Sequence, residues 1–492
     1  MSTPKDAAAV ILLRNPDDPM VYWVRRAQYL QYLGGFHAYP GGQRDVGDAT
    51  IEMESCDGDD SRTMRVCAIR ELFEETGVLL AKGAEWLTTE ERSQMREDLG
   101  KDDKQFIDLV RAHGLKLDAS LLMDGGRWMT PPLSPRRFDT WFFVAWLPEG
   151  QEPDVQLGEL EFGEWIRPAD ALKRWEAGEI LMVPPTRHAL QVLAEGVNEL
   201  PMRLGAIPKA WQEPIRRIEV KPGIVLFPLR TATLPPATHT NCYIVGGEEV
   251  VIIDPASPYE EEIEALDTFV DELLHEQRRV REIILTHQHK DHIGGAMHLR
   301  ERLGIPIATH RLTAEALSGK VAVDRYIEDN DIIALPGNPG WHLRALHTPG
   351  HARGHLCFFE ESLTALITGD NIIGIGSVLI DPPEGNMIDY LASLERLRTF
   401  PASVLFGAHG PPVGGPKHKI DQYVKHRLAR EACILDAVAK GASTPAEIVK
   451  VVYTDVPESV HKLAERSVIA HLEKLVTEQR VTQSGSKYFV SS

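Results

Sequence analysis

Cysteine is scarce in this chain of 492 residues, and the five cysteines stand far apart. No two of them form a CxxC pair, and an odd number leaves at least one thiol unpaired. A disulfide framework and a cysteine-rich zinc knuckle are therefore not expected. The pattern is typical of a reducing compartment, and we expect the protein to be cytoplasmic.

Long apolar runs and an excess of basic residues are also missing. The run Ala7–Leu13 is too short to cross a membrane and lacks the basic leader of a signal peptide. The net charge of −19 argues against general affinity for nucleic acid. From Lys417 onward, however, 12 basic residues outnumber 9 acidic ones. We expect no membrane partner and a slightly basic C-terminal part.

The length requires more than one hydrophobic core, and the sequence divides into three parts. Residues 1–205 begin with two strand-like runs. Residues 206–416 alternate short apolar strands with amphipathic helices. Residues 417–492 contain three helical segments and a terminal hairpin. The prolines of residues 201–214 indicate a connector between the first two parts.

The most distinctive string lies directly after the apolar run Ile283–Leu285. Three imidazoles and one carboxylate fall within six positions there, followed by two glycines: His287, His289, Asp291 and His292. A loop of this kind at a strand end directs several side chains toward one point. Because imidazole is the commonest metal-binding side chain, the string predicts a metal site.

Three more candidate ligands follow downstream, each at a predicted strand end or turn flanked by glycine or proline: His351, Asp370 and His409. With these motifs the second part resembles the metallo-β-lactamase superfamily. All seven residues match the family's ligands in order. The resemblance implies an αββα sandwich that binds two zinc ions or other divalent transition metals. It assigns one ion to His287, His289 and His351, the other to Asp291, His292 and His409, and a bridging position to Asp370.

The resemblance also implies a hydrolase. Two divalent ions close together lower the pKa of a shared water and stabilise developing negative charge. Asp291 would orient the nucleophile or pass a proton to the leaving group. We expect His347 and His355 to support the site rather than touch substrate, and Asn241 and Asp254 to serve packing or turn formation.

The sequence narrows the class of substrate for the second part but does not identify the substrate. The 38 residues between Asp370 and His409 leave no room for the inserted domain of β-CASP nucleases, and no cysteine occupies a ligand position. Hydrolysis of a phosphodiester, including RNA, or of an ester remains, with a glyoxalase-II-like thioesterase as an alternative.

Residues 417–492 resemble the winged helix of the mitochondrial endoribonuclease-like β-lactamase group. The similarity rests on His426–Glu431, on the helix start Thr444–Glu447 and on His471–Leu475. This group implies single-stranded RNA as a partner. The small charge excess and the lack of an aromatic stacking platform leave a helical cap or a homodimer contact as alternatives.

The first part carries a second distinctive string, Arg70–Val78. On a helix, Glu71, Glu74 and Glu75 share one face, where like charges repel unless a cation neutralises them. Oxygen donors suit Mg²⁺ or Mn²⁺, although a solvated acidic helix is the alternative for this string alone.

The string resembles the second half of the Nudix box, and Pro40-Gly41-Gly42 resembles its opening loop. The likeness is to the coenzyme A diphosphatase-like branch, which implies an α/β/α sandwich. It further implies hydrolysis of nucleoside diphosphate-linked compounds, with Gly41, Gly42 and Arg70 shaping the substrate loop. Asp48 replaces the usual glutamate, and 21 residues separate it from Arg70 instead of seven.

These resemblances predict a multidomain α/β hydrolase with two centres. A small-molecule nucleotide or coenzyme A-type substrate is the expected partner, and both centres acting on one acyl-coenzyme A is a variant. The alternative is an RNA-associated factor whose Nudix part binds nucleotides without catalysis. An interrupted box that distorts the loop would favour that alternative.

Overall fold

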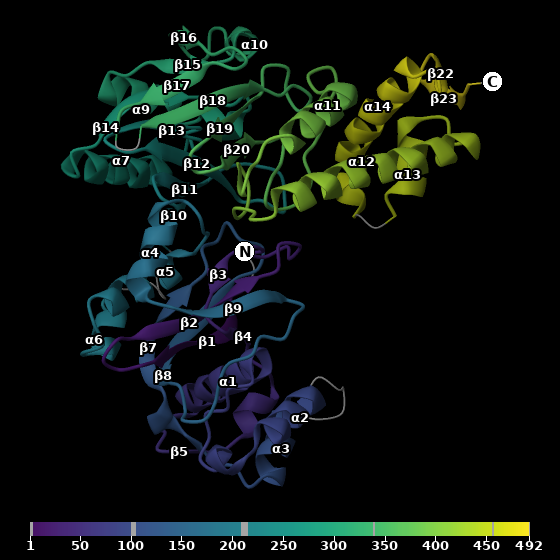
Figure 1. Cartoon of the computed structure of the whole chain (residues 1–492). Coiled ribbons are helices and arrows are strands. Elements are labelled where there is room, and N and C mark those ends of the chain that lie inside the picture. The colour runs from purple at the N-terminus through teal and green to yellow at the C-terminus, as the bar shows by residue number, and fades with distance from the viewer. Residues whose placement is uncertain (1–2, 100–104, 208–214, 338–339, 455–456, 492) are drawn as a thin grey trace. The chain divides into compact units, whose positions relative to one another are not determined.

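The computed structural model describes residues 3–99, 105–207, 215–337, 340–454 and 457–491. Its chain divides into two compact units, Met1–Pro222 and Gly223–Ser492 (Figure 1). Among the described residues, no helix combines the length and apolarity needed to span a membrane.

The first unit is built on one mixed sheet with the order β3-β2-β1-β8-β7, in which β4 also pairs with β1 and β9 with β2. The strands of this sheet are β1 (Lys5–Arg14), β2 (Met20–Arg26), β3 (His37–Ala38), β4 (Gly41–Gln43), β7 (Met123–Met129), β8 (Phe138–Trp146) and β9 (Leu160–Ile166). The strands β5 (Met53–Glu54) and β6 (Leu117–Asp118) pair with each other in a separate small sheet, and β10 (Ile218–Lys221) also lies outside the mixed sheet. The helices of the first unit are η1 (Gly47–Thr50), α1 (Asp59–Thr76), η2 (Ala84–Trp86), α2 (Thr89–Leu99), α3 (Phe106–Ala112), η3 (Ala119–Leu121), α4 (Pro168–Glu176), α5 (Pro184–Ala194) and α6 (Leu200–Leu204).

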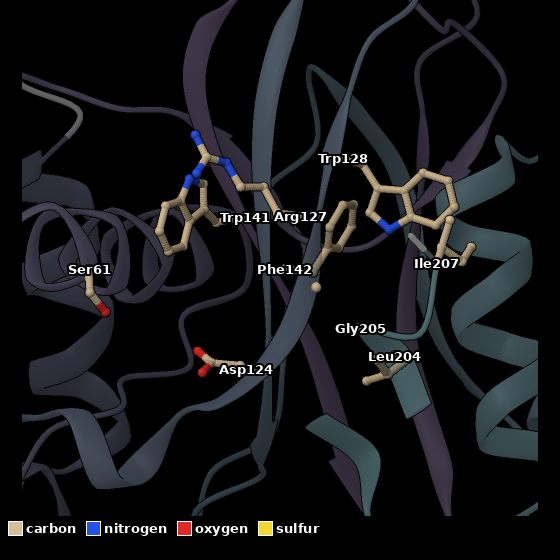
Figure 2. A pocket seen from close by; sticks show the side chains of 10 residues that line it. Ser61, Asp124, Arg127, Trp128, Trp141, Phe142, Leu204, Gly205 and Ile207 are labelled. Atoms are coloured by element: carbon tan, nitrogen blue, oxygen red, sulfur yellow. The ribbon is translucent and has the colours of Figure 1, made fainter. Parts of the chain in front are cut away.

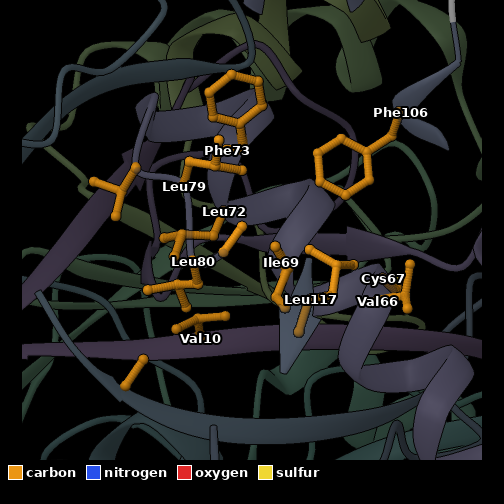
Figure 3. Close-up of a cluster of buried hydrophobic side chains, with 14 of the residues drawn as sticks. Val10, Val66, Cys67, Ile69, Leu72, Phe73, Leu79, Leu80, Phe106 and Leu117 are labelled. Carbon is orange, nitrogen blue, oxygen red and sulfur yellow. The ribbon is translucent and has the colours of Figure 1, made fainter. Parts of the chain in front are cut away.

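Helices cover both faces of this sheet. On central strand β1, Val10 belongs to the same hydrophobic cluster as Phe73 of α1 (Figure 3). The next residue, Ile11, packs with Leu190 of α5 in the cluster on the opposite face. Successive side chains of a strand point to opposite faces, which explains why the whole middle of β1 is buried. The unit is an α/β/α sandwich, as the Nudix resemblance implies.

The predicted connector between the first two parts is only partly described. Its beginning forms α6, in which Leu200 and Leu204 are buried against the first unit, so this segment packs rather than links. The remainder of the prediction, residues 208–214, lies outside the described residues.

Two sheets form the centre of the second unit, as far as the structure describes it. The strands that this unit contributes to the first sheet are, in spatial order, β11 (Ile224–Arg230), β12 (His239–Gly246), β13 (Glu249–Ile253), β14 (Arg279–Ile284), β15 (Ile307–Thr309) and β16 (Arg325–Tyr326). The second has β17 (Ile332–Leu335), β18 (Trp341–His347), β19 (Leu356–Glu360), β20 (Ala365–Gly369) and β21 (Val404–Gly407), also in order. The helices with these sheets are α7 (Glu260–His275), α8 (Lys290–Ile293), α9 (Ala296–Leu303), α10 (Arg311–Ala316) and α11 (Met387–Arg398).

Each sheet of the second unit has its own helical layer. Phe269 of α7 stacks on Phe227 of β11 with ring centres 4.9 Å apart, inside one cluster. Tyr390 and Leu394 of α11 pack with Leu405 of β21 in another. The resulting αββα sandwich is the predicted fold of this part.

A winged helix follows the sandwich. It consists of α12 (Pro416–Ala439), α13 (Pro445–Val452), η4 (Glu458–Val460), α14 (His461–Thr477), β22 (Val481–Ser484) and β23 (Lys487–Val490). The predicted start of α13 is a capping box: Glu447 N donates to Thr444 Oγ1 at 3.3 Å, and Thr444 N donates to Glu447 Oε2 at 3.1 Å. The described residues therefore form the three predicted fold types: an α/β/α sandwich, an αββα sandwich and a winged helix.

Candidate metal centres

All seven predicted ligands of the second unit lie in two groups. Within each group, one ligand atom from every residue lies within 4.8 Å of the others. The first group is His287, His289, His351 and Asp370, and the second is Asp291, His292 and His409.

Strand pairing explains why ligands distant in sequence meet. Strands β20 and β21 run parallel with Gly369 paired to Gly407, so both end at the same edge of the sheet. The next turn brings Asp370 Oδ1 to 3.3 Å from His409 Nε2. Gly369 has φ +48, and a Cβ there would lie 2.6 Å from His355 Nε2, so only glycine fits.

The nitrogens of the first group face one point. His289 Nδ1 lies 2.9 Å from His287 Nε2 and 3.0 Å from His351 Nε2. Two nitrogens bound tetrahedrally at about 2.0–2.1 Å from a zinc ion would be about 3.3 Å apart. The observed spacing is therefore close to that of metal ligands.

Hydrogen bonds fix the outward nitrogens of the imidazoles. The Nδ1 atom of His351 lies 2.8 Å from Leu379 O, and that of His409 lies 2.9 Å from His239 O. These carbonyl acceptors hold the proton on Nδ1, which leaves Nε2 with a free lone pair. Both Nε2 atoms face the ligand groups.

Some atoms in the centre are buried without a protein hydrogen bond. His292 Nε2 and Asp370 Oδ1 have no such partner among the described residues. Unsatisfied buried polar atoms are costly, and a cation would satisfy both. Imidazole nitrogens combined with carboxylate oxygens suit divalent transition metals. The residues therefore fit the metals that the resemblance implies.

Burial and neighbouring charges prepare the ligands. Burial lowers the pKa of His351 to about 4 and holds the pKa of His287 well below its usual value, so both imidazoles are neutral at pH 7. Burial opposes ionisation of Asp370, but His409 and His292 outweigh it and hold the pKa of that carboxyl well below its usual range. Neutral imidazole and ionised carboxylate are the forms that bind metal.

Two supporting residues have larger roles than the sequence suggested. The Asp254 carboxylate accepts from Thr286 N at 2.8 Å and lies 2.8 Å from His292 Nδ1, at a residue with φ +52. Asn241 Nδ2 donates to the carbonyls of Gly407 and Gly410, both at 2.8 Å. Asp254 therefore orients an imidazole, and Asn241 braces the loop that carries His409. A carboxylate directly after a buried strand was the available signal.

The other two histidines lie outside the ligand groups. His355 Nε2 accepts from Asp370 N at 3.1 Å, so it supports the backbone at that carboxylate. His347 stacks on His310 with ring centres 4.1 Å apart, and its Nε2 lies 2.8 Å from Arg353 O. Both contacts are those of supporting residues.

In the first unit, Arg70 joins the predicted Nudix loop to helix α1. Its guanidinium donates twice to Asp48, at 2.8 and 2.9 Å, and to Gln43 O at 3.0 Å. It also donates to Glu71 at 2.8 Å and to Glu74 at 3.3 Å. Asp48 is 1% exposed, so this bidentate ion pair is buried.

The long insertion leaves the loop closed. Its residues form η1, the short strand β5 and the first turns of α1, which begins at Asp59. Asp48, despite its shorter side chain and its distance from Arg70 in sequence, still pairs with that arginine. The departure from the Nudix spacing therefore lengthens the helix without separating the loop from it.

Glycines bring the loop against the carboxylates. A Cβ on Gly42 would lie 2.4 Å from Glu71 Oε2, and one on Gly41 would lie 2.3 Å from Ala8 O. Gly41 N donates to Glu75 Oε2 at 2.9 Å. Both glycines are required for this approach.

The three glutamates lie on one helix, but their carboxylate oxygens do not form a close group of ligand atoms. Burial raises the pKa of Glu71 to about 7 and of Glu75 to about 8, and it also raises the pKa of Glu74. Over the described ranges, the close groups of possible ligand atoms are the two in the second unit. The donor chemistry suits Mg²⁺ or Mn²⁺, because a cation would offset the cost of ionising buried carboxylates.

A pocket of about 290 Å³ lies elsewhere in the first unit, beside edge strand β7 (Figure 2). Trp128, Trp141 and Phe142 line it, together with Ser61 from the first turn of α1. Ser61 precedes Glu71 by ten residues, or about 15 Å along a helix. The pocket is therefore distant from the carboxylates along α1.

Three family models match parts of the chain. Residues 235–409 match the Metallo-beta-lactamase superfamily, residues 57–193 the NUDT19 Nudix domain, and residues 444–488 the Beta-lactamase associated winged helix domain. These matches agree with the three resemblances drawn from the motifs.

Similar proteins cover the second unit. The Beta-lactamase-like protein 2 homolog of Drosophila melanogaster is 30% identical over 264 residues, which are 51% of this chain and 87% of that protein. The Atrochrysone carboxyl ACP thioesterase of Aspergillus fumigatus is 27% identical over 242 residues, 45% of this chain and 70% of that protein. A solved Beta-lactamase domain protein from Burkholderia ambifaria covers 58% of this chain and 96% of its own, with a TM-score of 0.51 at 21% identity, and supports the fold alone.

Proposed function

The chain belongs to the metallo-β-lactamase superfamily, and we propose that its second unit is a hydrolase with a two-ion centre, preferably of zinc. The convergence of seven donor side chains carries this proposal. The two carboxylate oxygens of Asp370 support a bridging role. Its Oδ1 lies 3.3 Å from His409 Nε2 and 3.6 Å from His292 Nε2, whereas its Oδ2 lies 3.5 Å from His351 Nε2. Each oxygen therefore faces one ligand group.

The bound ions and the neighbouring side chains would have different roles in the reaction. A pair of bound divalent ions supplies a water of lowered pKa and stabilises negative charge on the substrate. Asp291 has a side chain that is 18% exposed, with its Oδ2 3.7 Å from His409 Nε2. A carboxylate that is bonded weakly and reaches solvent suits proton transfer to a leaving group.

The first unit would be a second, independent centre. Glu71, Glu74 and Glu75 would hold Mg²⁺ or Mn²⁺, and Gly41, Gly42 and Arg70 would shape the loop that receives a diphosphate. The intact ion pair between Arg70 and Asp48 supports a catalytically active loop, rather than a domain that has kept its fold and lost its activity. We propose a nucleoside diphosphate-linked or coenzyme A-type compound as its substrate, with residues 1–205, 206–416 and 417–492 as the functional parts.

For the second unit, hydrolysis of a thioester and of RNA are the two substrate classes to separate. A relative named as a thioesterase favours the first. The winged-helix match and the basic excess of residues 417–492 favour the second. Charge reversal at the exposed Lys450, Lys462 and Lys487 would weaken RNA binding and reduce its salt dependence if this domain contacts the phosphate backbone.

A substrate panel tests both centres. The full chain, Asp370→Asn and Glu74→Gln would be assayed on a single-stranded RNA, an acyl thioester, an aryl ester, a nucleoside diphosphate sugar and coenzyme A, with metals controlled. We expect Asp370→Asn to abolish ester or RNA cleavage and Glu74→Gln to abolish diphosphate cleavage. Activities that survive both substitutions would refute the assignments.

A further inference from the structure

The loop between β20 and α11, residues 371–386, is bonded to the segments that carry the metal ligands. We refer to it as the clasp loop. Leu379 O accepts from His351 Nδ1 at 2.8 Å. The Glu384 carboxylate accepts from Gln288 Nε2 at 2.7 Å, and Gln288 stands between two predicted ligands. The clasp loop therefore determines which nitrogen of His351 faces the first ligand group.

An arginine of the winged helix grips the same loop. Arg427 of α12 is 4% exposed and donates to the carbonyl of Val378, which directly precedes Leu379. Its guanidinium also lies 5.3 Å from the ring centre of Tyr390, whose hydroxyl donates to Asn371 O at 2.8 Å. Burying a guanidinium is costly unless its donors are satisfied, so these partners restrict the loop strongly.

A second arginine holds the loop farther along. Arg466 of α14 donates through Nε to Asp381 Oδ1 at 2.5 Å, and it also donates to the carbonyl of Pro382. Two helices of the winged helix therefore reach the clasp loop on both sides of Leu379. Their bonds end one to three residues from the carbonyl that holds His351.

We propose that the winged helix is a positioning element of the metal centre, in addition to any role it has in substrate binding. Arg427 and Arg466 fix the clasp loop, and the loop fixes the tautomer and ring orientation of His351. This inference rests on the proposed two-ion centre. Without the arginines, Leu379 O would move, and the His351 ring would lose the bond that keeps the Nε2 lone pair toward the first ligand group.

Metal binding by the full chain tests this relay. The variants are Arg427→Ala, Arg466→Ala, their combination, and Arg427→Lys. Arg430→Ala is a matched control, because Arg430 lies on the same helix but donates to Val452 O at 2.7 Å, inside the winged helix. Bound Zn²⁺ would be counted, its affinity measured against a chelator, and the absorption spectrum of the Co²⁺-loaded chain recorded.

We expect the double variant to bind one of its two ions at least about tenfold more weakly, as is typical when a bond behind a ligand is lost. The Co²⁺ spectrum should change for that ion alone, and Arg427→Lys should restore part of the affinity. Arg430→Ala should bind both ions as the unaltered chain does.

The clasp loop would have no positioning role if Arg466→Ala and the double variant stay folded and bind both ions with unaltered affinity and spectrum. Should Arg427→Ala unfold, Arg427→Lys and Arg466→Ala still decide the question, because the Arg466 side chain is only partly buried. Asp370→Asn tests the proposed two-ion centre separately from the positioning role of the winged helix. An unchanged ion count in that variant would overturn the two-ion centre itself.

Discussion

The two candidate centres solve the problem of gathering ligands in opposite ways. In the second unit, the ion pairs of the seven donors, over the described residues, are with one another or with Asp254. In the first unit, Arg70 pairs with Asp48, Glu71 and Glu74. The donors of the second unit are therefore paired mainly among themselves, whereas two carboxylates of the first unit are paired with a cationic side chain of the protein.

The chemistry of the ligands explains this difference. Burial keeps His287 and His351 neutral, whereas the pKa of His292 and of His409 is raised: burial opposes these shifts, but the Asp370 carboxylate outweighs it. The imidazoles of the second unit can therefore be held together around this carboxylate before a metal binds. Carboxylates repel strongly when buried, so a guanidinium must offset their charge. We therefore expect metal binding to leave the geometry of the second unit nearly unchanged and to rearrange the partners of Glu71 and Glu74.

The largest expected effect is that of metal removal. Chelation should lower ester or RNA cleavage by at least about 1,000-fold, because the ions supply several kcal/mol of stabilisation to the transition state. Zn²⁺ should restore that activity, whereas Mg²⁺ or Mn²⁺ should restore diphosphate cleavage. Rate measurements after dialysis against each ion check this, and one ion that restores both activities would contradict the distinction.

Arg70→Met should destabilise the first unit by about 3–5 kcal/mol, because it leaves the buried Asp48 carboxylate unpaired. Chemical denaturation measures this change in unfolding free energy. Arg167→Met removes the exposed pair with Asp18 and should alter stability far less. Equal effects of the two substitutions would show that Arg70 is not an internal cation of special importance.

Glu75→Gln should lower diphosphate cleavage by about 100-fold, since it removes a metal-binding charge while keeping the side-chain shape. Cleavage by the second unit should be unaffected. Glu90→Gln, on the exposed start of α2, is the control. Loss of both activities in Glu75→Gln would mean that the centres are coupled.

Asp254→Asn should weaken binding of the ion held by the second ligand group by about 10–100-fold. The substitution weakens the bond that orients His292 but leaves the bond between His351 and Leu379 intact. Chelator competition measures the two affinities. If the ion of the first group were the one affected, the assignment of His292 to the second group would be wrong.

The smallest expected effect is on the pH dependence of stability, at a histidine and a carboxylate of the winged helix. Glu431 has a lowered pKa: burial opposes this shift, but His471 and Lys474 outweigh it. Burial lowers the pKa of His471, which therefore stays neutral. Below about pH 6.5 this histidine is protonated in the unfolded chain but not in the folded chain. The free energy of unfolding therefore falls as pH decreases. Thermal unfolding of His471→Gln should show a weaker decline between pH 7 and 5 than the unaltered chain.

Strand positions were predictable and their limits were not. The apolar run Trp141–Leu147 predicted a strand, but β8 begins at Phe138, because Phe138–Thr140 pair with Lys5–Ala7 of β1. The run itself reports burial, whereas the first residues of the strand depend on a partner far away in sequence. The run Ile224–Phe227 likewise predicts a strand, but β11 continues to Arg230, because Pro228–Arg230 pair with β12.

The candidate ligands and the helical carboxylates could be predicted from the sequence, because residue type and short spacing specify metal-binding chemistry locally. Only the tertiary structure decided which residues support them. Asp254 reaches His292 through parallel strands, Asp48 reaches Arg70 across an insertion, and Arg427 reaches the clasp loop from another domain. These contacts join residues whose separation along the chain carries no information about their distance in space, so they exist only once the sheets and helices have packed.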